Sequence, residues 1–266
     1  MKHSAADWCY LERSGLPPAD YYRRLRAAGF TGVEMVSPQH RDLACAAGLE
    51  LVTQSVPDLE RGLNHRAHHE WLIPVIHAAL EDARSHQVQN LIVFSGRRAA
   101  LSEAEGISGC TAGLRAVAAH AAETRVTVLL EVLNEYDHVD QQCSRMAFAR
   151  PVIEAVGSPS VKMLYDLYHG ARMGDDLRTW DAATVAMVGH IHVAACEGRS
   201  CPRPGAAPDY PAIVPGIVAA GYQGYWGHEF LPTGDVLGEL SASRDHLQTG
   251  LALQAGAARR HTERSG

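Results

Sequence analysis

Short apolar segments rich in β-branched residues alternate with longer amphipathic stretches along this chain. The spacing of roughly 30 residues is that of a strand followed by a helix. Because helices follow nearly all of the eight predicted strands, we expect an α/β fold in which a closed parallel sheet forms a (β/α)8 TIM barrel. The pattern predicts strands at 4–9, 32–36, 49–54, 90–96, 126–133, 162–167, 189–195 and 224–230, and helices at 19–28, 42–47, 69–86, 104–123, 145–156, 176–187, 212–220 and 235–254.

The chain of 266 residues is close to the length of about 250 that such barrels have. We see no linker and no shift in composition, so we predict one domain over residues 1–256 and a polar, disordered tail over 257–266. An open dinucleotide-binding sheet would need a glycine-rich turn after its first strand. The sequence there is Ser14-Gly-Leu-Pro-Pro, which is no phosphate-binding loop.

Composition excludes several classes of protein. The formal net charge of −6 argues against a nucleic-acid groove, and no apolar run approaches the ~20 residues of a membrane span. The first residues lack the apolar stretch of a signal peptide. The six cysteines show no CxxC spacing and are expected to be reduced thiols. We therefore expect a cytoplasmic protein without nucleic-acid or membrane partners.

Side chains that can bind a metal ion occur where four of the predicted strands end. Glu131, Asp166, His192 and Glu229 each come from a different strand in the second half of the chain. Neighbouring strands of a barrel bring their carboxyl ends to one mouth, so these four side chains are predicted to converge. Three carboxylates and one imidazole favour Mn²⁺ or Mg²⁺, with Zn²⁺ or Co²⁺ as alternatives.

Taken singly, these residues have ordinary structural explanations. A lone glutamate at a strand end is more often part of a salt bridge, and a lone His192 is more often a hydrogen-bonded core residue. His190 points to the same face and is given a structural role. Glu34 could orient a ligand or form hydrogen bonds inside the barrel, and the buried structural role is the stronger expectation. His68 and His69 are adjacent and face different sides of a helix, so they do not predict a second metal site. The joint pattern of four strand ends in register carries the metal-site prediction.

Several short motifs are spread along nearly the whole chain, from about Trp8 to Leu247. They are Gly29-Phe-x-Gly-Val-Glu34, Gly62-Leu-Asn64, Phe94-Ser-Gly96, Leu130-Glu-Val-Leu-Asn134, Leu164-Tyr-Asp-Leu-Tyr-His169, Gly189-His-Ile-His192, Gly198-Arg199 and Gly221-Tyr-x-Gly-Tyr-x-Gly-x-Glu229-Phe-x-Pro232. Together these motifs resemble the xylose-isomerase-like TIM-barrel superfamily, specifically its hydroxypyruvate isomerase group. The Asp-x-Tyr-His element and the last glutamate motif are fairly specific for the isomerase and epimerase branch.

The resemblance implies roles for these residues. In such enzymes a divalent ion binds the carbonyl and the adjacent hydroxyl of the substrate. Glu131 and Glu229 would be both metal ligands and catalytic proton carriers, and Asp166 and His192 would complete the coordination. The substrate-binding residues are expected to be His169, Arg199, Asn64 and Ser95, with a loop surface charge as the equal alternative for Arg199 and turn stabilisation as the stronger one for Asn64.

The predicted activity is a metal-dependent isomerisation of hydroxypyruvate to 2-hydroxy-3-oxopropanoate through a cis-enediolate. One rival is a ketose 3-epimerase on free sugars, because ketose epimerases have histidine at the position of His192 and many hydroxypyruvate isomerases have glutamine. Two others are a nonenzymatic, metal-dependent sugar-acid binding protein and a nuclease on the same barrel. The negative net charge argues against the nuclease. The sequence of the segment 200–208 differs from that of the hydroxypyruvate isomerase group, so the identity of the substrate is not determined by the resemblance. The expected partner is a small sugar or hydroxy-keto acid, and a homo-oligomer is compatible with the superfamily.

Overall fold

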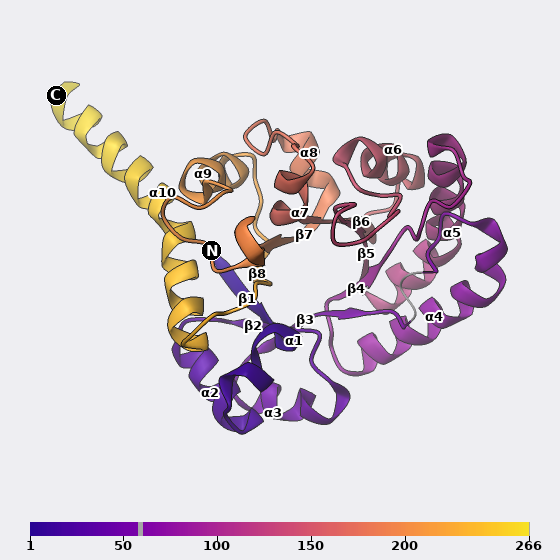
Figure 1. Cartoon of the computed structure of the whole chain (residues 1–266), viewed down its shortest axis with the longest axis horizontal. Helices are drawn as coiled ribbons and strands as arrows, with labels where there is room; N and C mark the ends of the chain where they lie inside the picture. The colour runs from indigo at the N-terminus through magenta and orange to yellow at the C-terminus, as the bar shows by residue number, and fades with distance from the viewer. Residues whose placement is uncertain (58–60, 266) are drawn as a thin grey trace.

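Eight parallel strands close into a single barrel (Figure 1). The structure, a computed structural model, describes residues 1–57 and 61–265, with side chains described as far as Leu253. The strands pair in chain order and β1 pairs with β8, which confirms the predicted (β/α)8 TIM barrel. The strands are β1 Lys2–Ala6, β2 Gly32–Glu34, β3 Glu50–Ser55, β4 Asn90–Val93, β5 Thr127–Val132, β6 Val161–Asp166, β7 Val188–Val193 and β8 Tyr225–His228.

Helices cover the outside of this barrel (Figure 1). None within residues 1–57 and 61–265 is long and apolar enough to cross a membrane. The α-helices are α1 Asp7–Tyr10, α2 Pro18–Ala27, α3 Arg41–Ala46, α4 His69–Ser85, α5 Glu103–Thr124, α6 Met146–Val156, α7 Leu167–Arg172, α8 Ala182–Met187, α9 Tyr210–Ala219 and α10 Val236–Ser265, and the 3₁₀ turns are η1 Glu12–Ser14, η2 Pro38–His40, η3 Arg66–His68 and η4 Glu197–Arg199.

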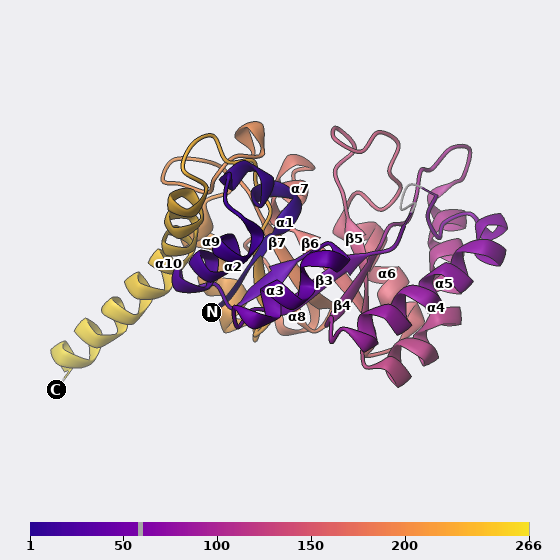
Figure 2. The ribbon, with the colours of Figure 1, turned by 90° about the horizontal axis from the view of Figure 1, so that it is seen from below.

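Two short helices at the ends of strands were not predicted. The first strand ends at Ala6 and not at residue 9, and α1 follows at once. The strand β6 passes directly into α7 because the Asp166 side chain accepts hydrogen bonds from the backbone N–H groups of Tyr168 and His169, as an N-cap does. Both helices lie on the same side of the barrel (Figure 2). They bring Trp8 and His169 to the mouth.

Two predicted helix limits were wrong. The predicted helix 176–187 is helical only as α8, because Asp181 has an extended backbone and caps the helix by accepting a hydrogen bond from the N–H of Thr184. The predicted end of the last helix at 254 is passed by α10, which continues to Ser265 and projects from the barrel (Figure 1). Alanine and arginine, which are strong helix formers, make up residues 257–260. The division into a domain over 1–256 and a disordered tail stays a prediction.

The strand register brings the candidate residues to one edge. Asp166 on β6 pairs with His192 on β7, and His192 pairs in turn with Gly227 on β8, two residues before Glu229. Glu131 lies on β5, one residue before the pair Val132–Tyr165 with β6. Parallel strands end on the same side of the sheet, so all four side chains reach the mouth of the barrel.

The inside of the barrel is filled below this edge. Ile92, Leu129 and Leu164 form a small buried cluster that is separate from the larger core between strands and helices, and Met35 and Phe94 pack on it. This apolar plug closes the barrel beneath the mouth, as stacked side-chain layers do in such barrels. The polar groups above it are therefore enclosed on one side and open on the other.

Candidate metal centre and active site

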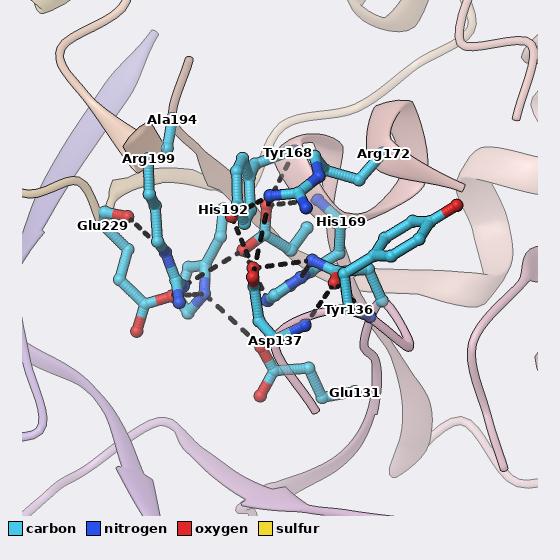
Figure 3. Close-up of polar contacts among 12 residues, drawn as sticks. Glu131, Tyr136, Asp137, Tyr168, His169, Arg172, His192, Ala194, Arg199 and Glu229 are labelled. Atoms are coloured by element: carbon cyan, nitrogen blue, oxygen red, sulfur yellow. Dashed lines mark hydrogen bonds and ion pairs between the residues drawn. The ribbon is translucent and has the colours of Figure 1, made fainter. Parts of the chain in front are cut away.

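Glu131, Asp166, His192 and Glu229 form one compact cluster of metal-binding groups. Each contributes one ligand atom, and these four atoms all lie within 4.8 Å of one another. All four residues are buried, and Glu131, Asp166 and His192 lie on the neighbouring, paired strands β5, β6 and β7. The structure thus brings together the four residues that the sequence singled out, several of them visible in Figure 3.

The imidazole of His192 tests whether a cation fits here. Its Nε2 atom lies 3.0 Å from Oε2 of Glu34, while Nδ1 lies 3.2 Å from Oε2 of Glu229 and 3.8 Å from Oε1 of Glu131. Among the described residues, Nδ1 has no hydrogen-bond partner although it is fully buried. A buried polar atom without a partner is costly. A divalent ion would satisfy Nδ1 and the surrounding carboxylate oxygens together, so these residues fit a metal ion.

Burial and charge shift the pKa values of Glu131 and Glu229 in opposite directions. Burial and the nearby Glu229 carboxylate raise the pKa of Glu131 to about 8. Burial opposes the charge of Glu229 as well, but His192 and Arg199 outweigh it and hold the pKa of Glu229 well below its usual value. Two carboxyl groups whose pKa values are pushed apart can act as an acid and a base at one substrate.

The guanidinium of Arg199 lies inside the cluster. Its Nη2 atom donates to Oε2 of Glu229 and lies 3.5 Å from Oδ2 of Asp166, while its Nε atom donates to the backbone carbonyl of Glu229 at 3.2 Å. The rings of Trp8 and Tyr168 lie 5.5 Å and 5.2 Å from the guanidinium carbon. Arg199 is therefore no loose surface charge, and its charge faces two of the candidate metal ligands (Figure 3).

His169 is placed in the cavity wall by α7. Its Nδ1 atom lies 2.5 Å from Nδ2 of Asn134, a group that can only donate, so Nδ1 accepts and the proton of the neutral ring sits on Nε2. Burial lowers the pKa of His169 to about 4, which keeps the ring neutral at pH 7. Within the described part of the chain Nε2 has no hydrogen-bond partner and lies 3.5 Å from Oδ2 of Asp166. It is a donor available to a bound molecule.

A cavity of about 330 Å³ opens above these groups. Its polar side consists of carboxylate, imidazole and guanidinium groups, and its other side is mostly apolar. The cavity is large enough for a small molecule, which supports a small-molecule site. The lining residues are Trp8, Met35, Ser55, Ile92, Phe94, Glu131, Leu133, His138, His169, Arg199 and Glu229.

Asn64 and Ser95 are not brought to this cavity. The Asn64 side chain donates to the carbonyl of Arg97 and to Oε1 of Gln142, both at 2.7 Å, and accepts from the next backbone N–H. The Ser95 hydroxyl accepts from the backbone N–H of Cys143 at 2.9 Å. Neither lines the cavity described by residues 1–57 and 61–253. Both hold loops together in this structure, and their substrate contacts stay a prediction.

One family accounts for the whole arrangement. The sequence matches the xylose isomerase-like TIM barrels over residues 22–249. The chain belongs to this family. A human relative, provisionally named hydroxypyruvate isomerase, is 28% identical over 261 residues, which cover 90% of this chain and 92% of the relative. The hydroxypyruvate isomerase of Escherichia coli (strain K12) is 23% identical over 224 residues, or 79% of this chain and 86% of that protein.

A solved structure agrees with this assignment at the level of the fold. The AP endonuclease, family 2, from Brucella melitensis superposes with a TM-score of 0.79 at 22% identity, covering 90% of this chain and 97% of that one. The relatives confirm the resemblance to the hydroxypyruvate isomerase group and identify this xylose isomerase-like barrel as an isomerase.

Two contacts of the xylose isomerase-like site were not foreseen from the sequence. The first is the indole of Trp8, whose Nε1 atom donates to Oε1 of Glu229 at 2.8 Å. Asn134 orients both His169 and the carboxylate of Asp137. The Asn134 position stood in a recognised motif, but the contact of Trp8 depends on the helix α1, which gave no periodic signal in the sequence.

Proposed function

We propose that this protein is a divalent-metal-dependent isomerase that interconverts hydroxypyruvate and 2-hydroxy-3-oxopropanoate through a cis-enediolate. The observation that carries the proposal is the convergence of Glu131, Asp166, His192 and Glu229, whose four ligand atoms all lie within 4.8 Å of one another. Each carboxyl can bind an ion through one oxygen and carry a proton on the other. Three carboxylates and one imidazole favour Mn²⁺ or Mg²⁺, with Zn²⁺ and Co²⁺ as alternatives.

The proton transfer follows from these two groups. An oxygen of Glu229 takes a proton from C3 of hydroxypyruvate. The electron pair of that C–H bond forms the C2–C3 double bond, and the π pair of the C2 carbonyl moves onto O2. The hydroxyl proton passes from O3 to O2, Glu131 gives its proton to C2, and C3 becomes the aldehyde carbon. Exchange with water then restores the protonation of both carboxyls. The divalent ion would stabilise the negative charge of the enediolate oxygens.

Two further side chains have defined tasks in this proposal. The Nε2 proton of His169 points at the ligand cluster and would donate to a substrate oxygen. Arg199 would hold the substrate carboxylate, because its planar guanidinium can bind such a group with two parallel hydrogen bonds. The apolar side of the cavity would keep water from the carbanion-like intermediate.

A ketose 3-epimerase is the second candidate. Arg199 already pairs with Glu229 and Asp166, and a neutral ketose has no carboxylate that would need the charge of Arg199. The histidine at position 192 also supports an epimerase, as ketose epimerases have histidine there. Both activities would use the same two glutamates, so the substrate decides between them.

Proton NMR in D₂O tests the proposal. The Mg²⁺-supplemented enzyme is incubated with hydroxypyruvate and, separately, with a panel of free ketoses. We expect conversion of hydroxypyruvate with deuterium incorporated at C2 of the product. Exchange at C3 of a ketose, without turnover of hydroxypyruvate, would replace the isomerase proposal by the epimerase. No exchange in any sample would contradict both proposals. Enzyme with Glu229→Gln serves as the control for non-enzymatic exchange.

A further inference from the structure

We propose that Glu34 is a positioning residue that fixes the tautomer of His192, so that Nδ1 is the atom that binds the metal ion. This inference rests on the metal centre of the proposed function and assigns a task to a residue outside it. Glu34 is the last residue of β2, fully buried, on a strand that contributes none of the four candidate ligands.

Four donors surround the Glu34 carboxylate. The Ser4 hydroxyl donates to Oε1 at 2.6 Å, and the Thr53 hydroxyl donates to Oε2 at 2.9 Å. Nε2 of His190 and Nε2 of His192 lie 2.9 Å and 3.0 Å from the same Oε2 atom. An ionised carboxylate can only accept hydrogen bonds, so a ring nitrogen at these distances must carry a proton. Glu34 therefore selects the Nε2–H form of His192.

This choice determines what the other side of the ring can do. With the proton on Nε2, a neutral His192 presents the lone pair of Nδ1 toward the carboxylates of Glu131 and Glu229. Lone pairs of three acceptors facing one another need a cation between them. In metalloproteins a carboxylate on the far nitrogen orients the imidazole in this way and raises its affinity for the metal.

The packing leaves Glu34 and His192 little freedom to rearrange. A Cβ atom at Gly227 would lie 2.3 Å from Oε1 of Glu34 and 2.7 Å from Cδ2 of His192. Glycine on β8 thus lets the glutamate and the imidazole meet across the barrel. The contact joins β2 to β7, which lie well apart in the strand order.

Glu34, His190 and His192 could also be taken as a second metal site, because their ligand atoms lie close together. The carboxylate, however, already has four donors, and both imidazoles donate through the nitrogen that faces it. A metal ion would have to displace these protons. We therefore assign this group to hydrogen bonding, and the stoichiometry of metal binding tests that assignment.

Metal binding and NMR together test the role of Glu34. Titration calorimetry with Mn²⁺ is performed on wild type, Glu34→Gln and His190→Gln. The amide of Glu34→Gln can turn its NH₂ group toward His192 and no longer enforces one tautomer, so we expect affinity to fall by about 10- to 100-fold. His190→Gln, which keeps the Glu34–His192 contact, should bind Mn²⁺ within about threefold of wild type. Equal affinity of wild type and Glu34→Gln would overturn the inference.

A spectroscopic measurement keeps the test valid if Glu34→Gln does not fold. In ¹⁵N-histidine-labelled wild-type protein saturated with Mg²⁺, the His192 signals should show a protonated Nε2, and His192→Asn identifies them by their loss. A proton on Nδ1 would refute the assignment. Two bound Mn²⁺ ions per chain would favour a second metal site at Glu34 instead. Absence of ion binding in the wild type would contradict the proposed metal centre. If the wild type binds an ion and Glu34→Gln binds it with the same affinity, the metal centre is supported and only the role of Glu34 is contradicted.

Discussion

Trp8 donates a hydrogen bond from Nε1 to Oε1 of Glu229 at 2.8 Å. The contact joins the short helix after the first strand to the residue that follows the last strand, across the closure of the barrel. The indole also faces the guanidinium of Arg199, which itself pairs with Glu229. One exposed tryptophan therefore holds both the proposed base and its cationic partner.

Replacing Trp8 by phenylalanine should reduce turnover without unfolding the protein. The variant keeps an aromatic ring beside Arg199 and removes the donor to Glu229. A hydrogen bond to a charged group contributes about 1.5–3 kcal/mol, so we expect kcat to fall by about 10- to 100-fold. Initial rates with hydroxypyruvate measure the loss, and the thermal midpoint should change little because Trp8 is 46% exposed. Wild-type rates in this variant would show that the contact does not orient the base.

Glu131→Gln and Glu229→Gln should each nearly abolish turnover. Glutamine keeps the size of the side chain but cannot carry the proton, and a general acid or base is commonly worth about 10²–10⁴ in rate. The circular dichroism spectrum should stay that of the wild type. Glu197→Gln is a matched control, since this exposed glutamate lies on the loop of Arg199 and pairs only with Arg203 among the described contacts. Near-normal turnover in either active-site variant would contradict the two-glutamate mechanism.

The strand ends are the part of the site that could be predicted from the sequence. Each strand signal is local, and closing a parallel barrel brings the ends together whatever the loops do. Glu131, Asp166, His192 and Glu229 could therefore be placed by their own strands. The same argument gave the barrel itself, whose strands all overlap the apolar segments that predicted them, although the first strand ends at Ala6 and not at residue 9.

The loops could not be predicted in the same way. Asn64 and Ser95 stand in recognised motifs, but their side chains are used to tie neighbouring loops together. The position of Arg199 depends on a 3₁₀ turn in which it has a φ of 50°, a backbone conformation that no periodic pattern announces. Contacts between separate loops depend on such details, and for that reason the partners of Trp8 and Arg199 emerged only from the folded chain.

Metal removal should abolish activity, and metal affinity should rise with pH. Chelation is expected to inactivate the enzyme, and Mn²⁺ or Mg²⁺ to restore it. Burial disfavours a charge on His192, but the carboxylates of Glu229 and Glu34 outweigh burial and raise its pKa. A proton on Nδ1 competes with the ion, so binding must release it and becomes weaker as pH falls. Calorimetry in buffers of different ionisation enthalpy measures the protons released. Full activity of metal-free protein would exclude the Lewis-acid role.

Asp7 should make the protein less stable as pH rises. Burial raises its pKa from 3.8 to about 7, against the opposing hydrogen bond from the Tyr22 hydroxyl. Because the folded protein holds this proton more tightly than the unfolded chain, the stabilisation is complete below pH 3.8 and is lost as pH rises through about 7. At about 1.4 kcal/mol per pKa unit, the effect has an upper limit of about 4 kcal/mol.

The pH dependence assigned to Asp7 can be isolated with two variants. Asp7→Asn keeps the shape of the side chain and cannot ionise. Its free energy of unfolding, measured by urea denaturation, should therefore rise relative to that of the wild type between pH 4 and 8. Tyr22→Phe removes the hydroxyl that favours the charged form, and should move the loss of stability to higher pH. Parallel stability curves for wild type and Asp7→Asn would contradict the prediction, because they would show that folding does not raise the pKa of Asp7.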